Sequence, residues 1–186
     1  MSVPLVAATG LHSDILREAV QGLKYGNVQV LAAALGARLA RRLQMQNWTI
    51  DMLIPVPLHA ARLRERGYNQ AQMVCEAAAR QLALPCVPEA LRRERYTHSQ
   101  VGLTRAERMR NVVDAFSADP DRVSQRTIVV VDDVCTTGST LSACAQALLA
   151  AGARMVYGLT VTVARDTNIV SHYTQGVGHG DQNSRS

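Results

Sequence analysis

The sequence is poor in several features that mark particular classes of protein. Aromatic residues make up only 4% of the 186 residues, and Lys24 is the only lysine. No cysteine stands in a C-x-x-C pair, so we expect no zinc site and no disulfide framework. No apolar run reaches the length of a membrane span, and the N-terminus lacks the basic start and apolar core of a signal peptide. These absences predict a soluble protein of the reducing cytoplasm.

The composition that remains is that of one folded domain with a basic surface. A hydrophobic content of 47% supports one sizeable core, built mainly from Ala, Val and Leu. The 20 basic residues exceed the 15 acidic ones, which gives a net charge of +5 carried almost wholly by arginine. Guanidinium groups favour bidentate contact with phosphate and carboxylate. The charge therefore fits a polyanionic ligand, nucleic acid included, and equally a solvated surface.

The hydrophobic pattern alternates between helix and strand. Apolar residues at helical spacing predict helices over residues 13–24, 28–46, 68–84 and 139–151, and a short basic helix over 59–67. Apolar runs predict strands over residues 51–58, 127–131 and 155–163. Residues 85–116 are arginine-rich and weakly periodic, as in a functional loop or a linker. This order predicts an α/β fold with a mostly parallel sheet, and a disordered tail over residues 166–186.

The stretch TIVVVDDVCTTGST (Thr127–Thr140) carries the strongest chemical signal. Two adjacent carboxylates, Asp132 and Asp133, follow a buried strand, although like charges there repel. The loop after them combines Gly138, which can adopt positive φ, with hydroxyl donors, and the next helix begins near Ser139. Such a loop suits phosphate, whereas ionised carboxylates accept hydrogen bonds from neighbouring hydroxyls. A phosphate beside a pair of hydroxyls describes a ribose 5-phosphate. The loop lacks the spacing and the lysine of a Walker A motif.

The same stretch resembles the phosphoribosyl diphosphate (PRPP) binding motif of type I phosphoribosyltransferases. That motif is an apolar strand, a D/E-D pair and a loop of Thr and Gly; Cys135 replaces its usual aliphatic residue. The alternative is an acid-capped helix start after a core strand. The resemblance implies that Asp132 and Asp133 are catalytic residues that hold the ribose hydroxyls. It also implies a phosphate-binding loop of Val134, Cys135, Thr136, Thr137, Gly138, Ser139 and Thr140.

Further motifs make the chain similar to the ComF (competence protein F) family. LIPVPLHAARLRERGYNQA (Leu53–Ala71) resembles that family's proline-bracketed strand followed by R-x-R-G-[FY]-N-Q. The Q-x-x-L and R-x-x-N elements within HSQVGLTRAERMRNVVDAF also match, and LKYG (Leu23–Gly26) resembles the end of an N-terminal helix. The resemblance covers residues 12–165. Many members begin with a zinc ribbon of paired C-x-x-C units; we expect it to be absent, or to lie upstream of a misassigned start.

The resemblance implies a domain over residues 1–165, with a helical hood at 12–46 that selects the acceptor and a core at 51–165. It places the pyrophosphate site at Leu58, His59, Arg62, Arg66 and Asn69. Against this, the arginines are equally typical of a solvated helix face, and a lone histidine is more often structural. A mobile loop would cover the reacting centre and contribute Arg95, Gln100, Arg105 and Arg108. An arginine-rich linker or a nucleic-acid contact fits that segment as well.

The implied activity is displacement of pyrophosphate from C1 of PRPP by an unidentified acceptor. Mg²⁺ is expected to bind with PRPP and not directly to the protein, and no residue stands out as a general base. Two other functions remain open: a PRPP-sensing regulator without turnover, and a factor that handles single-stranded DNA, for which few aromatic residues are free to stack on bases. Competence proteins and a second copy of the chain are further expected partners.

Overall fold

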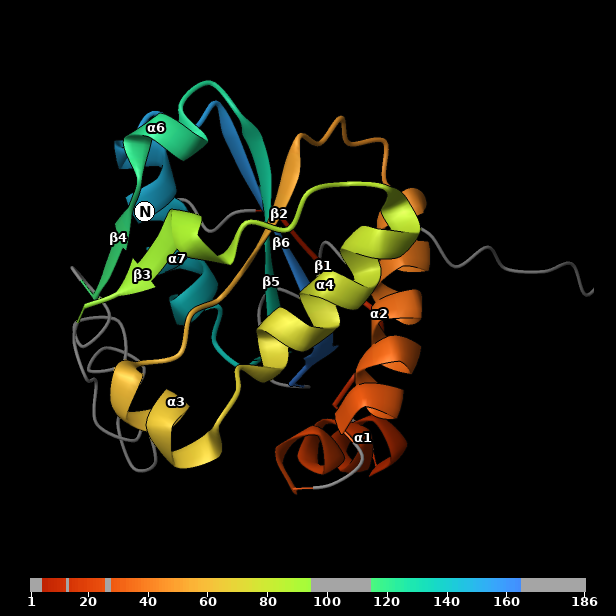
Figure 1. The fold of residues 1–186 in the computed structure, drawn as a ribbon. Helices are drawn as coiled ribbons and strands as arrows, with labels where there is room; N and C mark the ends of the chain where they lie inside the picture. Colours follow the sequence, from red (N-terminus) through yellow and green to blue (C-terminus); the bar gives the residue numbers. More distant parts are fainter. Residues whose placement is uncertain (1–4, 13, 26–27, 95–114, 165–186) are drawn as a thin grey trace, which may run out of the picture.

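The computed structural model describes residues 5–12, 14–25, 28–94 and 115–164. At its centre lies a four-stranded sheet in the order β1 (Val6–Ala8), β6 (Met155–Val163), β5 (Thr127–Cys135) and β2 (Met52–Pro55) (Figure 1). All three pairs of neighbouring strands are parallel. The predicted strands over 51–58, 127–131 and 155–163 thus lie side by side in one sheet, as expected from the alternation of strand and helix.

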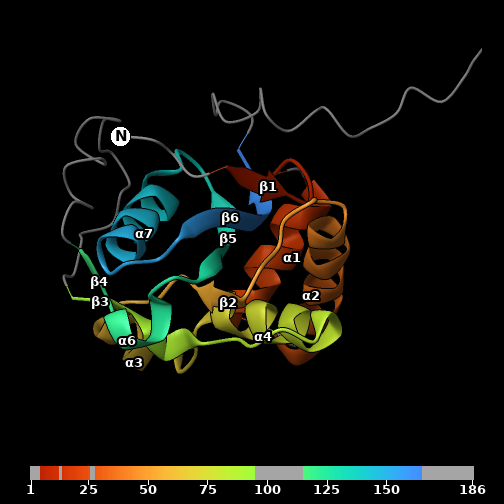
Figure 2. The same ribbon diagram turned by 90° about the horizontal axis from the view of Figure 1, so that it is seen from above.

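Helices cover both faces of this sheet. On one side lie α1 (Asp14–Tyr25), α2 (Val28–Gln44) and α4 (Gln70–Leu82), and on the other side lies α7 (Ser139–Ala150) (Figures 1 and 2). The α7 side also carries a 3-10 turn, η1 (Pro88–Ala90), the antiparallel pair β3 (Leu91–Arg93) and β4 (Phe116–Ala118), and the short helix α6 (Pro120–Val123). The helix α3 (Ala60–Arg66) follows β2.

The alternating side chains of the strands divide the core into two clusters. Ile128 and Val130 of β5 pack with α7, β3 and β4, whereas Val129 and Val131 pack with α2 and α4. All four side chains are buried. Because both faces of this strand are covered, successive side chains are all buried and the sequence is a continuous apolar run. Residues 127–131 therefore show no alternation of apolar and polar residues.

Besides the 3-10 turn η1, four of the described elements were not predicted from the sequence. The strand β1 is only three residues long, and it joins the sheet through parallel pairing with Gly158, Leu159 and Thr160 of β6. The pair β3 and β4 and the helix α6 are equally short. Elements of three or four residues carry too little periodicity to be seen in the sequence. The pair β3–β4 also shows that the arginine-rich segment has firm structure at both of its ends.

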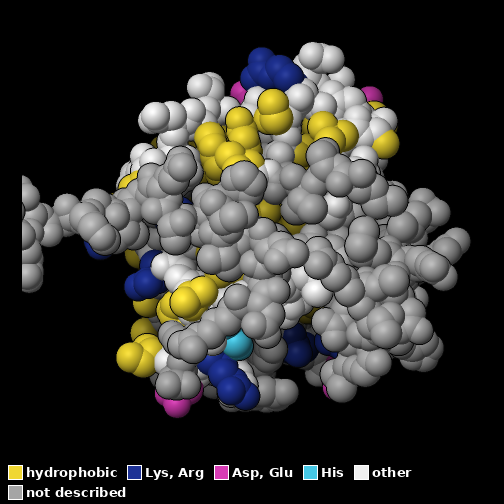
Figure 3. Space-filling model, turned by 180° about the vertical axis from the view of Figure 1, so that it is seen from behind, with side chains coloured by type: hydrophobic (Ala, Val, Ile, Leu, Met, Phe, Trp, Pro, Cys, Tyr) yellow, Lys and Arg dark blue, Asp and Glu magenta, His cyan; other side chains and the backbone are white. Residues whose placement is uncertain are grey.

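The helices expected to form a hood lie against the sheet. Leu35 and Leu39 of α2 belong to the same buried cluster as Val74 of α4 and Val129 of β5. The division into a hood and a core stays a prediction, as does the tail over residues 166–186, which lies outside the described residues. None of the helices in the described ranges is long and apolar enough to cross a bilayer. Seen from behind, the basic side chains among the described residues form separate small groups (Figure 3).

The close approach of α2 to α4 depends on Gly36. A Cβ atom at this position would lie 2.5 Å from the Cβ of Ala77 and 2.9 Å from the backbone nitrogen of Ala78. Both distances are far shorter than a van der Waals contact, and backbone cannot move aside as the end of a flexible side chain can. Gly36 therefore determines how closely α4 packs against α2, and α4 begins at the carboxyl end of the sheet.

We expect Gly36→Val to lower the free energy of unfolding by about 1–3 kcal/mol, the usual range for overpacking a tight contact. Valine is a better helix former than glycine, so helix propensity alone would predict a gain in stability. A measured loss would therefore come from the steric clash. Urea denaturation would measure it. Ala33→Val, at an exposed position on the same helix, is the matched control. Equal stability of the two variants would contradict the account of this helix contact.

Candidate ligand-binding crevice

The candidate site exists because two neighbouring strands end at different points. The last pair between β2 and β5 joins Pro55 to Val131, and the Val56 nitrogen donates to the Val131 carbonyl at 2.8 Å. Beyond that point β5 continues for four more residues, paired only with β6. The prediction that the strand ends at Val131 is thus wrong: Asp132 and Asp133 lie within β5. Pairing with β6 holds their backbone while the other edge of β5 is open to a ligand.

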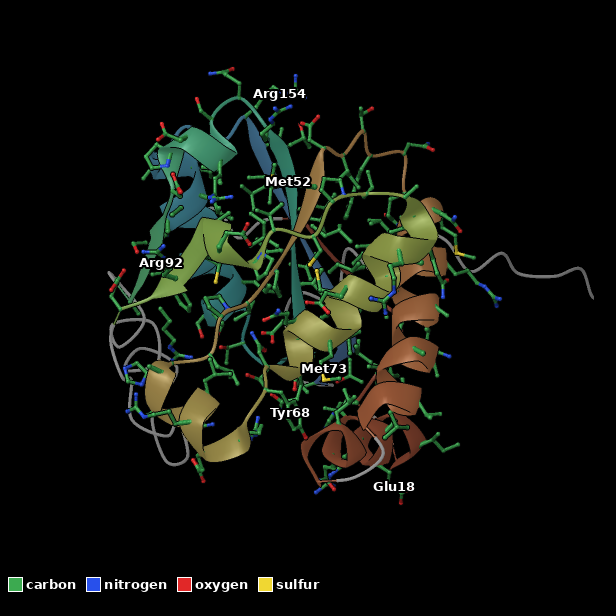
Figure 4. All side chains as sticks on the ribbon, viewed as in Figure 1. Glu18, Met52, Tyr68, Met73, Arg92 and Arg154 are labelled. Carbon is green, nitrogen blue, oxygen red and sulfur yellow. The ribbon has the colours of Figure 1, made fainter. Side chains whose placement is uncertain are left out.

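A crevice of about 180 Å³ occupies this open edge. It lies at the carboxyl end of the sheet, where ligands bind in open α/β folds. Figure 4 shows Tyr68, in the turn before α4, at this end of the sheet, and Arg154 at the opposite end. The crevice is lined by residues from the turn after β2, α3, the start of α4, β3, β5 and the start of α7: Val56, Pro57, Leu58, Arg62, Arg66, Asn69, Gln70, Ala71, Arg93, Asp132, Asp133, Val134 and Thr140.

The two carboxylates are held in place by hydrogen bonds, although their burial and mutual repulsion are unfavourable. The Asp133 nitrogen donates to Asp132 Oδ1 at 2.9 Å, and the Val134 nitrogen donates to Asp133 Oδ1 at 2.8 Å. Burial raises the pKa of the Asp132 carboxyl well above its usual range, and repulsion from Asp133 raises it further, whereas Arg93 opposes both effects. A ligand that supplies hydroxyl donors or positive charge would relieve this cost.

The loop after β5 forms a small recess beside the crevice. The recess is lined by Asp132 and by every residue from Val134 to Leu141. Gly138 adopts a φ of 76°, as the phosphate-cradle hypothesis requires, and it forms the N-cap of α7 without a capping side chain. The Thr137 and Ser139 hydroxyl oxygens are 2.9 Å apart. The loop thus presents hydroxyls at the start of a twelve-residue helix, where the helix dipole favours an anion.

Cys135, the last residue of β5, also lines the recess, but its thiol is unsuited to act as a nucleophile. Burial raises its pKa to about 12, with a further contribution from Asp132. Because the thiolate and not the thiol is the reactive form, the raised pKa makes Cys135 a poor nucleophile at neutral pH. Its side chain is buried and packs with the α7 side of the core. The structure thus explains why a cysteine can stand where the motif usually has an aliphatic residue.

The opposite wall of the crevice is basic. Arg62 and Arg66 lie on α3, which Gly67 ends with a φ of 79°. Asn69 caps α4 by accepting from the Ala71 nitrogen at 3.1 Å, and it donates to the Val56 carbonyl at 3.0 Å. Asn69 therefore fixes α4 to the chain that leaves β2. Arg93 enters from β3, with its guanidinium 5.4 Å from the centre of the Phe116 ring.

The crevice and recess together contain most of the predicted site. The crevice brings together Leu58, Arg62, Arg66, Asn69, Asp132, Asp133, Val134 and Thr140, and the recess adds Cys135, Thr136, Thr137, Gly138 and Ser139. His59 does not line either one. Instead its Nδ1 caps α3 by accepting from the Ala61 nitrogen at 3.2 Å, which is a structural role. The predicted mobile-loop residues lie outside the described ranges: Arg95, Gln100, Arg105 and Arg108.

Two polar residues of the crevice, Arg93 and Gln70, were not singled out from the sequence. Arg93 was one of many arginines in a segment expected to be mobile, and only its place on β3 distinguishes it from the others. Gln70 stands inside the N-Q motif, yet a helical position next to a cap gives no sign that its side chain faces a ligand. The motif is the one signal that could have drawn attention to it.

The raised pKa of Asp132 predicts how stability depends on pH. Between the ordinary carboxyl pKa of about 4 and the raised value, the folded state binds more protons than the unfolded state. The free energy of unfolding should therefore fall as the pH rises through this window. Asp132→Asn removes that dependence, so the stability advantage of the variant should grow with pH and vanish near pH 4. Urea denaturation from pH 4 to pH 8 measures it; a difference that stays constant would contradict the electrostatic account.

Comparison with known proteins agrees with this geometry. The family model of the phosphoribosyl transferase domain matches residues 26–174. Competence protein F of Haemophilus influenzae is 36% identical over 113 residues, which are 59% of this chain and 49% of that protein. DNA utilization protein YhgH of Escherichia coli K12 is 39% identical over 127 residues, which are 68% of this chain and 54% of that protein. The chain thus spans about half the length of these curated relatives.

A solved structure supports the fold independently. The glutamine phosphoribosylpyrophosphate (PRPP) amidotransferase of B. subtilis superposes with a TM-score of 0.51 and 24% identity, over 72% of this chain and 26% of that protein. At that level of identity the likeness shows the fold alone. Together, the sheet, the motif loop and the match over residues 26–174 lead to one conclusion: the chain belongs to the phosphoribosyl transferase domain family and, within it, to the ComF family.

Proposed function

We propose that the chain binds PRPP in the crevice and transfers its phosphoribosyl group to an acceptor with release of pyrophosphate. One observation carries this proposal. A single crevice presents adjacent carboxylates on β5 and arginines on α3 and β3, and it adjoins a recess lined by hydroxyls at the start of α7. Each group suits a different part of one molecule: carboxylates suit ribose hydroxyls, hydroxyls with backbone N–H groups suit a monophosphate, and arginines suit a diphosphate.

The recess and the crevice share residues, which supports binding of one ligand across both. Asp132, Val134 and Thr140 line both the recess and the crevice. A 5-phosphate held at the start of α7 would therefore place its ribose against Asp132 and Asp133. The diphosphate at C1 would then point to the wall of Arg62, Arg66 and Arg93. This order of groups along the crevice is that of phosphate, ribose and diphosphate in PRPP.

The residues of the crevice also fit Mg²⁺ that arrives with its ligand. No cluster of three or more His, Cys, Asp or Glu side chains occurs among the described residues. Mg²⁺ usually keeps several waters and binds through one or two carboxylates together with substrate phosphates. Asp132 and Asp133 would favour a nearby cation through their negative charge, while oxygen atoms of the ligand and water would coordinate it. Bound with PRPP, Mg²⁺ would neutralise charge on the leaving diphosphate.

In the proposed transfer, the bond between C1 and the diphosphate oxygen breaks and the electron pair leaves with pyrophosphate. A lone pair on a nitrogen or oxygen atom of the acceptor then forms the new bond to C1, and that atom releases its proton to solvent. Asp132 and Asp133 would stabilise positive charge that develops on the ribose ring, and the arginines would stabilise the departing diphosphate. The names of the relatives, competence protein F and DNA utilization protein, are consistent with a role connected to DNA, and the acceptor itself is unidentified.

A PRPP sensor without turnover would use the same crevice. Measurement of pyrophosphate release distinguishes the two functions. Release of pyrophosphate in a screen of nitrogen and oxygen acceptors supports transfer. PRPP binding without release on any acceptor supports sensing. Direct binding of single-stranded DNA gains less support, because aromatic residues, on which bases could stack, make up only 4% of the chain.

The double variant Asp132→Asn/Asp133→Asn tests the proposed role of the carboxylates. Each charge-assisted bond to a ribose hydroxyl contributes about 1.5–3 kcal/mol, so PRPP affinity should fall at least about tenfold in calorimetric titration with Mg²⁺. Without ligand the variant should melt at a higher temperature, because two adjacent charges are removed. Glu65→Gln/Asp121→Asn, which neutralises two exposed carboxylates outside the crevice, is the control. A double variant that melts lower and binds PRPP normally would show that the carboxylates only stabilise the fold.

The helix α3 offers a matched pair of variants for the diphosphate wall. Arg66 lines the crevice and is half-buried, whereas Arg64 is exposed on the same helix and does not line it. Arg66→Ala should weaken pyrophosphate binding about fivefold or more, since a partly exposed charge contact contributes about 1 kcal/mol. Arg64→Ala should leave it unchanged. If both variants weaken binding equally, the arginines act only through the net charge of the surface.

A further inference from the structure

Gln70 is the most deeply buried polar side chain of the crevice. It is the first residue of α4 and is only 2% exposed, yet it lines the same hollow as Asp132, Asp133 and Arg66. Within the part of the chain that the structure describes, its amide nitrogen has no hydrogen-bond partner. Nothing in the fold requires a polar residue here, because the neighbouring buried positions of α4 are filled by alanine, valine and cysteine.

The next glutamine along the helix shows what a structural role looks like. Gln72 Nε2 donates to Glu76 Oε1 at 2.8 Å, one turn further along α4. That pair satisfies the amide and stabilises the helix modestly. Gln70 lacks such a partner, and an unsatisfied buried amide lowers the stability of the fold. Buried polar groups without partners are rare in folded proteins, and a binding site is one setting that accounts for them.

The surroundings of Gln70 indicate the charge of the group that would pair with it. Arg62, Arg66 and Arg93 line the same crevice, and Gln70 stands at the positive end of the α4 dipole. Asn69 has already capped this helix end by accepting from the Ala71 nitrogen. The amide of Gln70 therefore remains as an additional donor among cationic groups, a setting that favours an oxyanion.

We propose that Gln70 is a ligand-binding residue whose side-chain amide donates a hydrogen bond to a diphosphate oxygen in the crevice. The inference rests on the proposed function, in which that diphosphate belongs to PRPP. A turn about the Cγ–Cδ bond exchanges the positions of the amide oxygen and nitrogen, so the donor can be presented to the ligand without movement of α4. The amide adds a directional contact to the arginines, which supply most of the charge.

Two substitutions at Gln70 and one control test this role. Gln70→Met keeps the length of the side chain and removes both amide atoms, and Gln70→Glu keeps the shape and one oxygen while replacing the donor. Gln72→Met makes the first substitution at the partnered glutamine of the same helix. Melting temperature without ligand, and calorimetric affinity for PRPP with Mg²⁺ and for inorganic pyrophosphate with Mg²⁺, are measured for each protein.

We expect Gln70→Met to melt at or above the wild-type temperature and to bind both diphosphates about tenfold more weakly. Gln70→Glu should lose more affinity, since it adds negative charge beside the ligand. Gln72→Met should melt lower and bind normally. A fall in melting temperature for Gln70→Met with unchanged affinity would overturn the inference and assign the amide to the fold.

The two probes separate this inference from the proposed function. If the wild-type chain binds pyrophosphate but not PRPP, the proposed function fails, while the effect of Gln70→Met on pyrophosphate still decides the role of the amide. If the wild-type chain binds PRPP and Gln70→Met binds it equally well, only the role of Gln70 is overturned. If the wild-type chain binds neither compound, both proposals are wrong.

Discussion

The repulsion between two adjacent carboxylates is the constraint on which the site depends. Asp132 and Asp133 stay in place because β5 remains paired with β6 through Cys135, four residues beyond the last pair with β2. The backbone of β5 is therefore held from one side while its other edge faces the crevice. A loop would let these side chains move apart, and a strand paired on both edges would bury them. The unequal lengths of β2 and β5 thus leave both carboxylates fixed on β5 and reachable from the crevice.

The rest of the fold supports this arrangement with apolar packing. Alternate residues of β5 belong to two buried clusters, so the strand that carries the carboxylates is anchored on both faces. The basic wall is tied to the same frame, because Asn69 caps α4 and donates to the Val56 carbonyl. In addition, the Tyr68 hydroxyl donates to the Leu23 carbonyl at 2.6 Å, which joins this turn to α1. The crevice is thus lined mainly by rigid elements whose positions follow from the core.

The parts of the site that could be predicted from the sequence are those formed by residues close together in the chain. The three main strands could be recognised as short apolar runs, and the β5–α7 loop as a glycine and a cluster of hydroxyls within a few residues of one of them. Arg93 and Gln70 could not be distinguished from similar residues, since only tertiary structure brings β3 and the start of α4 to the same crevice. The extension of β5 was missed because polar residues usually end a buried strand; here β6 supplies the pairing that continues it. His59, by contrast, was predicted to bind pyrophosphate because it lies in the motif, whereas in the structure its side chain caps α3.

The central claim is that one ligand spans the recess, the carboxylates and the basic wall. Calorimetric titration of the wild-type chain with PRPP in Mg²⁺, beside ribose 5-phosphate and pyrophosphate titrated separately, tests it most directly. The account predicts one PRPP per chain, bound more tightly than either fragment, because its linked groups are held together in a preformed site. Failure to bind PRPP, or equal affinity for PRPP and ribose 5-phosphate, would contradict it.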